Sequence, residues 1–131
     1  GLTRPDGTRP LLIAVTQLTS TNQERMERDQ WIEKPLADVV MHYARNAREA
    51  GLDGVVCSPL ESPDVHAACG ADFLTVTPGV RFAGAAADDQ ARVATPARAK
   101  ELGSDFIVMG RPITAAEDPV EAYRRAMREF A

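Results

Sequence analysis

Residues 105–113 read D-F-I-V-M-G-R-P-I, an apolar strand that runs directly into Gly110 and Arg111. A glycine lets a ligand approach the backbone closely, and an arginine offers a fork of N–H donors that suits a phosphate. The preceding unit has the same form, because residues 73–77 run into P-G-V-R at 78–81. Two consecutive strands that end in glycine and arginine are typical of the phosphate corner of a (β/α)₈ barrel, which lies after its last two strands.

The length of the chain limits this interpretation to part of a barrel. The chain has 131 residues, whereas a complete (β/α)₈ barrel needs about 250. We therefore expect residues 11–131 to form the C-terminal half of a barrel, with residues 1–10 as a linker from a preceding helix, so that the chain begins inside a larger fold.

Strands and helices alternate along the sequence. Apolar runs predict strands at 11–16, 54–57, 73–77 and 106–109, and capping signals predict helices at 35–50, 62–69, 95–103 and from 118 onward. The continuous run at 11–16 is typical of a parallel strand that is buried on both faces. The long loop at 79–94 is of the kind that often serves as a functional lid. The pattern predicts an α/β fold with four parallel strands, each followed by a helix.

Two helices carry apolar stripes that we expect to face the core. The stripe on the first helix comprises Leu36, Val39, Val40, Tyr43, Ala47 and Ala50, and that on the last helix comprises Val120, Tyr123, Met127 and Phe130.

Composition narrows the class of protein. The formal net charge is −4, which argues against a nucleic-acid surface. No apolar run approaches the ~18 residues of a membrane span, and the first ten residues lack the apolar region of a secretory signal. The cysteines, Cys57 and Cys69, show no metal-ligand spacing and fit core positions in a reduced compartment. We expect a cytoplasmic protein without nucleic-acid or membrane partners.

Four strand-end motifs closely resemble those of bacterial orotidine 5′-phosphate decarboxylases. They are A-V-T-Q-L-T-S at 14–20, G-L-D-G-V-V-C-S-P at 51–59, D-F-L-T-V-T-P-G-V-R-F at 72–82 and D-F-I-V-M-G-R-P-I-T at 105–114. The resemblance covers essentially the whole chain in order and implies strands five to eight of that family's barrel.

The resemblance implies an enzymatic activity, but the catalytic motif of the family is not found in this sequence. The family converts orotidine monophosphate (OMP) to UMP and CO₂ without a metal or organic cofactor, using a Lys–Asp network carried mainly by a D-x-K-x-x-D motif. One Asp of that network comes from the neighbouring subunit of a dimer. The motif is absent here, and the only lysines, Lys34 and Lys100, lie in predicted helices. The resemblance therefore implies a phosphate-binding half that carries no catalytic residue and is inactive alone.

The resemblance also assigns binding roles by position. Gly110 and Arg111 would bind the phosphate, with Arg81 as a second arginine near it. Gln90 would bridge phosphate and pyrimidine as its loop closes, Thr19 would contact the pyrimidine, and Pro78 would line the apolar pocket beside the departing carboxylate.

Simpler roles stay open for several of these residues. Arg81 could instead pair with Asp88 or Asp89, Gln90 could be a solvated loop residue, and Thr19 could be a turn former. The two histidines, His42 and His66, are interpreted as helix-surface residues.

Two other hypotheses about the whole chain stay open. It could be half of another phosphate-binding barrel, such as a pentulose-phosphate epimerase or a hexulose-phosphate decarboxylase relative, although the L-T-S and T-P-G-V-R-F strings disfavour this. It could also be a non-catalytic half-barrel that self-assembles. We expect nucleotide monophosphate, phosphate or sulfate as ligand, an N-terminal half-barrel as partner where present, and a homo-oligomer built on exposed strand edges. Ile13, Val55, Leu74 and Ile107 are the expected barrel-interior residues.

Overall fold

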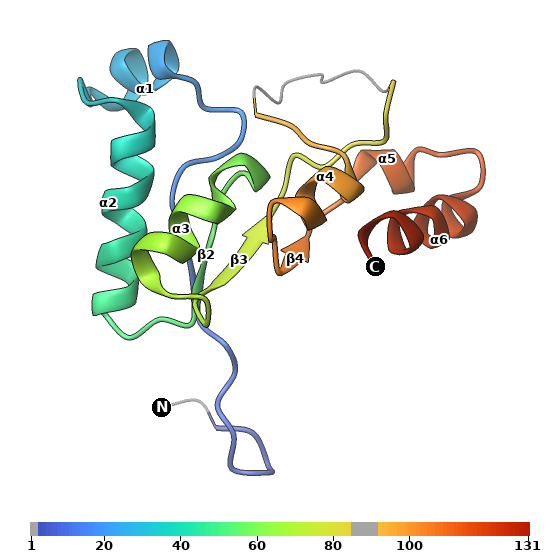
Figure 1. Cartoon of the computed structure of the whole chain (residues 1–131), viewed down its shortest axis with the longest axis horizontal. Helices are drawn as coiled ribbons and strands as arrows, with labels where there is room; N and C mark the ends of the chain where they lie inside the picture. The colour runs from blue at the N-terminus through green and yellow to red at the C-terminus, as the bar shows by residue number, and fades with distance from the viewer. Residues whose placement is uncertain (1–2, 85–91) are drawn as a thin grey trace.

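The computed structural model describes residues 3–84 and 92–131. Its sheet contains β1 (Ile13–Val15), β2 (Gly54–Val56), β3 (Leu74–Thr77) and β4 (Phe106–Ile107), in the order β1-β2-β3-β4 and parallel throughout (Figure 1). A helix follows each strand, so the predicted α/β half-barrel is confirmed. The strands at 11–16 and 106–109 are shorter than expected.

The four predicted helices are present, and three further helical segments were not predicted. The predicted ones are α2 (Leu36–Glu49), α3 (Ser62–Cys69), α4 (Pro96–Glu101) and α6 (Pro119–Phe130); the others are α1 (Gln23–Gln30), the 3₁₀ turn η1 (Pro59–Glu61) and α5 (Arg111–Thr114). Helix α1 begins where the Asn22 side chain accepts a hydrogen bond from the backbone N of Arg25. Met26 is the one residue of α1 that is buried. The sequence of α1 therefore lacks the apolar stripe from which a helix is predicted. None of the helices in residues 3–84 and 92–131 is both long and apolar enough to cross a membrane.

Side chains cap two of the four predicted helices, whereas α2 begins after Pro35 without a side-chain cap. Thr95 caps α4, and Asp118 accepts hydrogen bonds from the backbone N atoms of Val120 and Glu121 at the start of α6. Ser62, whose residue type and following proline give the capping signal for the predicted helix at 62–69, is instead the first residue of α3. The capping box lies one turn earlier, between Ser58 and Glu61, where η1 begins. The sequence pattern thus gave the right helix with the wrong cap, because η1 and α3 are continuous.

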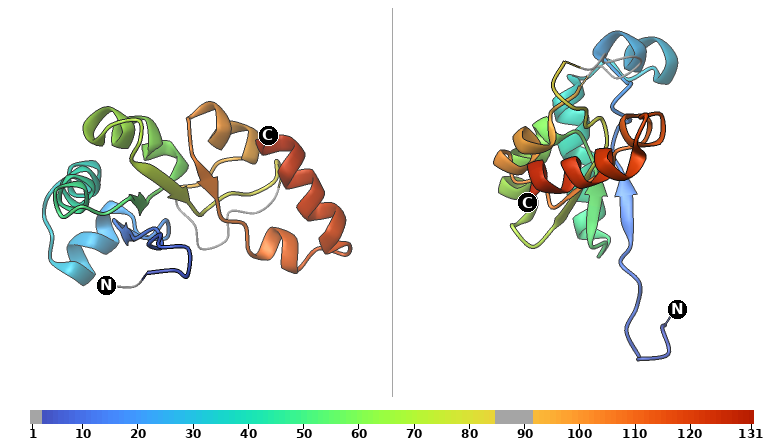
Figure 2. Two further views of the ribbon diagram at one scale, coloured as in Figure 1. Left: turned by 90° about the horizontal axis from the view of Figure 1, so that it is seen from below. Right: turned by 90° about the vertical axis from the view of Figure 1, so that its right-hand side faces the viewer.

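One face of the sheet carries the core. Val55, Cys57 and Phe73 are fully buried there, packed with the helix residues Ala44, Ala47, Val65 and Cys69. Figure 2 shows the helices arranged along the outside of the strands. This is the layering expected for the outer ring of a barrel.

The other face of the sheet is open. Val15, Val56, Val76 and Phe106 are aligned across the four strands, and laterally paired residues point to the same face. Val15 is 56% exposed and Phe106 is 51% exposed. The expectation that residues 11–16 are buried on both faces is therefore wrong, because nothing in the described chain covers the barrel-interior side.

Two of the four expected interior residues lie on the opposite face. Ile13 and Leu74 are aligned on the open face, but Val55 belongs to the next register position and is buried against helices. Ile107 pairs with buried Thr77 and faces α6. Side-chain direction alternates along a strand, so an error of one residue in register reverses the face.

The apolar stripes on the helices also need correction. Helix α6 buries Ala122 and Ala126, while Val120, Tyr123 and Met127 are exposed. Helix α2 buries Val39, Val40, Ala44 and Ala47, whereas Tyr43 is partly exposed and Ala50 is exposed. Tyr123, Met127 and Phe130 of α6 line a groove together with Ile107 and Met109, and with Ile113 of α5.

Candidate phosphate-binding site

A pocket of about 390 Å³ lies at the carboxyl ends of β1, β3 and β4. It is lined by Leu18, Thr19, Ser20, Pro78, Gly79, Arg81, Val108, Gly110 and Arg111. Five of the six residues expected to bind the nucleotide thus lie around one cavity. The sixth, Gln90, lies outside the described residues, as do Asp88 and Asp89.

The wall after β3 is held by backbone pairing. Arg81 donates its backbone N–H to the carbonyl of Ala94 at 3.0 Å, and Ala94 donates to the carbonyl of Gly79 at 3.3 Å. Gly79 has φ +78°, and a Cβ there would lie 2.9 Å from the Arg92 carbonyl oxygen. Only glycine therefore fits this turn without moving its neighbours.

The side chain of Arg81 has a donor that is not paired within the described residues. It is half-buried, and its buried Nε has no hydrogen-bond partner among the described residues. Its Nη1 makes only a long contact of 3.5 Å with the Val80 carbonyl. Buried donors are normally satisfied, so this arginine is suited to an anion in the pocket it lines.

The wall after β4 is open to a ligand. Gly110 precedes α5, and a Cβ added to it would meet nothing within 4 Å. Packing within the described chain therefore does not require a glycine here, whereas close approach of a ligand to the backbone would. Arg111 follows on the exposed first turn of α5 and lines the same pocket.

The wall after β1 is formed by Leu18, Thr19 and Ser20, of which Leu18 is exposed. Thr19 is 4% exposed, and the turn that holds it is closed by a hydrogen bond of 2.8 Å from the backbone N of Thr21 to the Leu18 carbonyl. Thr16 fixes the start of this turn, because its backbone N and its Oγ1 both donate to the Val56 carbonyl. The turn therefore presents Thr19 in a defined position.

Arg92 is a structural residue at this site that the sequence analysis did not single out. Its guanidinium forms an ion pair with Glu61, and its Nη2 donates to the carbonyl oxygens of Leu18 at 3.0 Å and Gln17 at 3.3 Å. Burial lowers the pKa of this guanidinium. The spacing of Ser58 and Glu61, typical of a capping box, was the one available signal for Glu61.

The chemistry of the pocket is that of anion binding. Its described lining contains two arginines and hydroxyl groups but no Asp, Glu, His or Lys. Within the described ranges, no group of three or more His, Cys, Asp or Glu residues could hold a metal ion. The nearby Cys57 is an inert core residue, because burial raises its pKa to about 12. The described lining can therefore bind an anion but supplies no general acid or base.

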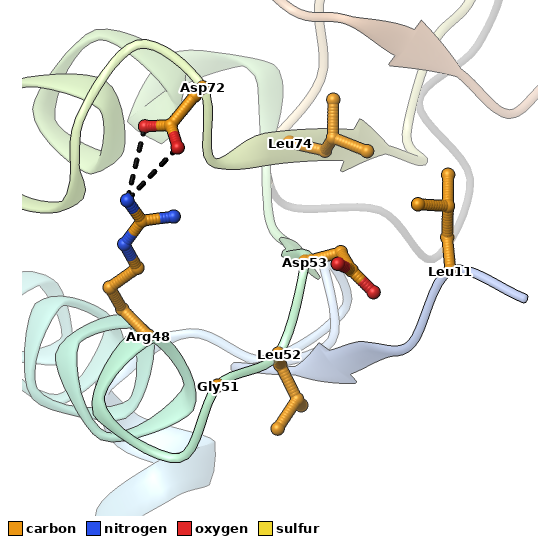
Figure 3. A pocket seen from close by; sticks show the side chains of 7 residues that line it. All are labelled: Leu11, Arg48, Gly51, Leu52, Asp53, Asp72 and Leu74. Atoms are coloured by element: carbon orange, nitrogen blue, oxygen red, sulfur yellow. Dashed lines mark hydrogen bonds and ion pairs between the residues drawn. The ribbon is translucent and has the colours of Figure 1, made fainter. Parts of the chain in front are cut away.

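A second pocket lies at the opposite, amino ends of the strands (Figure 3). Arg48 and Asp72 lie together on one side of it and form an ion pair of 3.0 Å. Asp53, on its rim, is bound by Arg9 and by the backbone N of Leu12. Because these charged groups already pair with one another, and this face of a barrel generally serves stability, we interpret this pocket as structural.

Four βα units in one parallel sheet define half of a (β/α)₈ barrel, and the ends of its last two strands present glycine and arginine around one pocket. Comparison of the sequence with known protein families identifies the type of barrel more specifically than the fold does. Residues 2–126 match the sequence model of the Orotidine 5′-phosphate decarboxylase / HUMPS family, and the chain belongs to this family.

Individual relatives agree with this assignment. The chain is 55% identical over 122 residues to an orotidine 5′-phosphate decarboxylase of Bacillus cereus (strain AH820), a match that covers 93% of this chain and 51% of the relative. The crystal structure of orotidine 5′-phosphate decarboxylase from Lactobacillus acidophilus superposes with a TM-score of 0.80 at 44% identity, over 98% of this chain and 52% of that one. The enzyme from Pyrococcus horikoshii OT3, at 19% identity and a TM-score of 0.65 over 95% of this chain and 52% of that one, shares the fold. The chain spans about half the length of the curated relatives it matches.

Proposed function

We propose that this chain is the phosphate- and pyrimidine-binding half of an orotidine 5′-phosphate decarboxylase, which converts OMP to UMP and CO₂ in pyrimidine biosynthesis. The observation that carries the proposal is the single pocket that brings Thr19, Arg81, Gly110 and Arg111 together from three strand ends. Family membership over residues 2–126 supports it.

The pocket suits a nucleotide monophosphate. Arg81 and Arg111 would bind the phosphate with charge-assisted hydrogen bonds, and Gly110 would let the phosphate approach the backbone. Thr19 on the opposite wall would contact the pyrimidine, with Pro78 beside the departing carboxylate. Inorganic phosphate or sulfate would occupy the arginine end alone.

Binding at the phosphate can accelerate chemistry at a distant carbon. Contacts to a non-reacting group contribute to the rate when they are realised most fully in the transition state. They also hold the substrate in its reactive orientation. The arginines would thus act without touching the reacting atoms.

The chemical step needs groups that this chain lacks. Removal of CO₂ leaves an electron pair on the pyrimidine carbon, which must receive a proton. The D-x-K-x-x-D motif that supplies this proton in the family is absent from the 131 residues, and the described pocket lining contains no Asp, Glu, His or Lys. We therefore propose that the chain is inactive alone and that an N-terminal half-barrel completes the site.

A complementation assay tests this function. The chain is expressed with the part of the Bacillus cereus (strain AH820) relative that it does not match, and we call the resulting complex the complemented protein. We expect OMP decarboxylation by the complemented protein and none by either half alone. Turnover by the chain alone would show that its own residues carry the chemistry. A folded complex that binds a pentulose phosphate but not UMP would favour the other type of barrel.

A second function is favoured by the open sheet face. In the absence of an N-terminal half, the exposed row that includes Val15 and Phe106 and the unpaired edges of β1 and β4 are suited to a second copy. A two-fold axis along the barrel would keep all eight strands parallel and pair β4 of each copy with β1 of the other. The chain would then be a homo-oligomeric half-barrel that binds phosphate without catalysis.

A further inference from the structure

Arg92 connects three segments that are distant in the sequence. Its side chain is 13% exposed and pairs with that of Glu61, which is 14% exposed and lies at the end of η1 after β2. Its Nη2 donates to the carbonyls of Gln17 and Leu18 in the turn after β1. Arg92 itself precedes α4, at the end of the long connection that follows β3.

Glu61 is held in place independently of Arg92. One of its carboxylate oxygens accepts a hydrogen bond of 2.8 Å from the backbone N of Ser58, within the capping box of η1. The other oxygen faces the guanidinium. Because η1 continues directly into α3, whose Val65 and Cys69 belong to the core, Arg92 is anchored to the rigid part of the fold.

The backbone of Arg92 reaches the opposite wall of the pocket. A Cβ at Gly79 would lie 2.9 Å from the Arg92 carbonyl oxygen and 3.3 Å from Cγ2 of Thr19. Gly79, Thr19 and Arg92 are therefore packed without space between them. Any shift of Arg92 would change the distance between the Thr19 wall and the Gly79–Arg81 wall.

Burial of the Arg92–Glu61 ion pair is not expected to add much to the stability of the fold. Removing a guanidinium and a carboxylate from water costs several kcal/mol per ion, and the attraction between them only partly offsets that cost. The planar fork of arginine can, however, bind a carboxylate and carbonyl oxygens at once, which the single ammonium of lysine cannot do in the same geometry. The arrangement thus suits a geometric role.

We propose that Arg92, anchored by Glu61, is a positioning residue that fixes the Leu18–Thr19 wall of the pocket relative to Gly79 on the opposite wall. The inference rests on the proposed function, because it assigns Thr19 to the nucleoside end of the ligand. Arg92 acts through these walls and does not line the pocket itself. The phosphate end is held by other groups: the backbone N of Arg81 donates to the Ala94 carbonyl, and Gly110 and Arg111 lie at the start of α5. We therefore expect phosphate affinity to be independent of Arg92.

The test is a comparison of two ligands bound to the complemented protein. Arg92→Met keeps the apolar stem and removes the guanidinium; we expect roughly tenfold weaker UMP binding and little change for inorganic phosphate. Arg92→Lys should not restore UMP affinity. The matched control is Arg98→Met on the surface of α4, where the Arg98 side chain pairs with Glu101 at 2.9 Å and is 55% exposed. This variant should bind both ligands normally.

A thermodynamic cycle separates positioning from general stability. If Arg92 acts through Thr19, Arg92→Met should cost much less UMP affinity in a Thr19→Ala background than in the unaltered protein. Glu61→Gln provides a milder variant in case Arg92→Met does not fold, and it should reproduce the selective loss of UMP binding in part.

The outcomes are distinguishable. Unchanged UMP affinity in a folded Arg92→Met or Glu61→Gln variant, equal losses for UMP and phosphate, or full additivity with Thr19→Ala would each overturn the inference alone. Failure of the unaltered complemented protein to bind UMP would overturn the proposed function and the inference with it.

Discussion

His66 and Asp105, which are 39 residues apart in the sequence, lie 3.0 Å apart between Nε2 and Oδ2. The same Asp105 oxygen accepts hydrogen bonds from the backbone N and Oγ1 of Thr75, a residue that is fully buried on β3. Asp105 thus joins α3, β3 and the start of β4. The sequence position of His66 had indicated a helix-surface residue. The structure instead places its ring in contact with Asp105.

Removing the Asp105 carboxylate should destabilise the fold. Asp105→Ala leaves the buried Thr75 N–H without its partner, at a cost of about 1–3 kcal/mol in the free energy of unfolding. Urea titration of the purified chain, followed by circular dichroism, measures this. Asp72→Ala is the control, because Asp72 pairs with Arg48 at the exposed surface and should change the midpoint little. Equal midpoints for the two variants would contradict the account.

Acid stability should depend on Asp53. The backbone N–H of Leu12, and then Arg9, lower the pKa of this carboxyl below its usual value. A lowered pKa adds stability that is complete above the unfolded value of about 3.9 and is lost as the pH falls through the folded value. Asp53→Asn should therefore flatten the acid side of the stability profile below about pH 5. Asp38→Asn, on the exposed surface of α2, is the control, and an unchanged profile for Asp53→Asn would refute the assignment.

The thiols should be unreactive in the folded chain. Cys57 is fully buried, and burial raises its pKa to about 12; burial also raises the pKa of Cys69. Because the thiolate is the nucleophile, iodoacetamide at pH 8 should label neither cysteine quickly until urea unfolds the chain. Intact mass against time measures this. Rapid labelling of Cys57 without unfolding would show that the core around β2 opens.

The open sheet face should drive assembly when the chain is alone. We expect a homodimer or larger oligomer by sedimentation equilibrium, and Val15→Lys should shift it toward monomer by placing a charge in the exposed apolar row. Leu60→Lys, at an exposed position on η1 away from the sheet, should leave assembly unchanged. A folded, monodisperse monomer at micromolar concentration would contradict this proposal.

The order of strands and helices was predictable from sequence because apolar runs, helix caps and glycines mark the boundaries of each βα unit. Thr95 and Asp118 cap the helices as expected. The burial of individual residues was less predictable. Val120 and Tyr123 have the spacing of a core stripe, yet their exposure depends on which neighbouring elements are present to cover them, and sequence periodicity carries no information about that.

Residues of the candidate site were predictable from sequence where they belong to a recognisable motif. Gly110, Arg111 and Arg81 were found because glycine and arginine follow the ends of two strands, and the structure places all three residues around one pocket. Arg92 was not found, because a lone arginine in a long connection has no distinguishing pattern. Its partners Leu18 and Glu61 are 74 and 31 residues away, and only the fold brings them together.

The most direct test of the phosphate assignment is the dissociation constant of UMP for the complemented protein at fixed ionic strength, with and without Arg111→Ala. Truncating one partner of a close charge pair should weaken binding by about 2–5 kcal/mol, while Arg98→Ala on the surface of α4 should have no effect. An Arg111→Ala protein that folds and binds UMP as tightly as the unaltered one would contradict the assignment of this pocket to the phosphate.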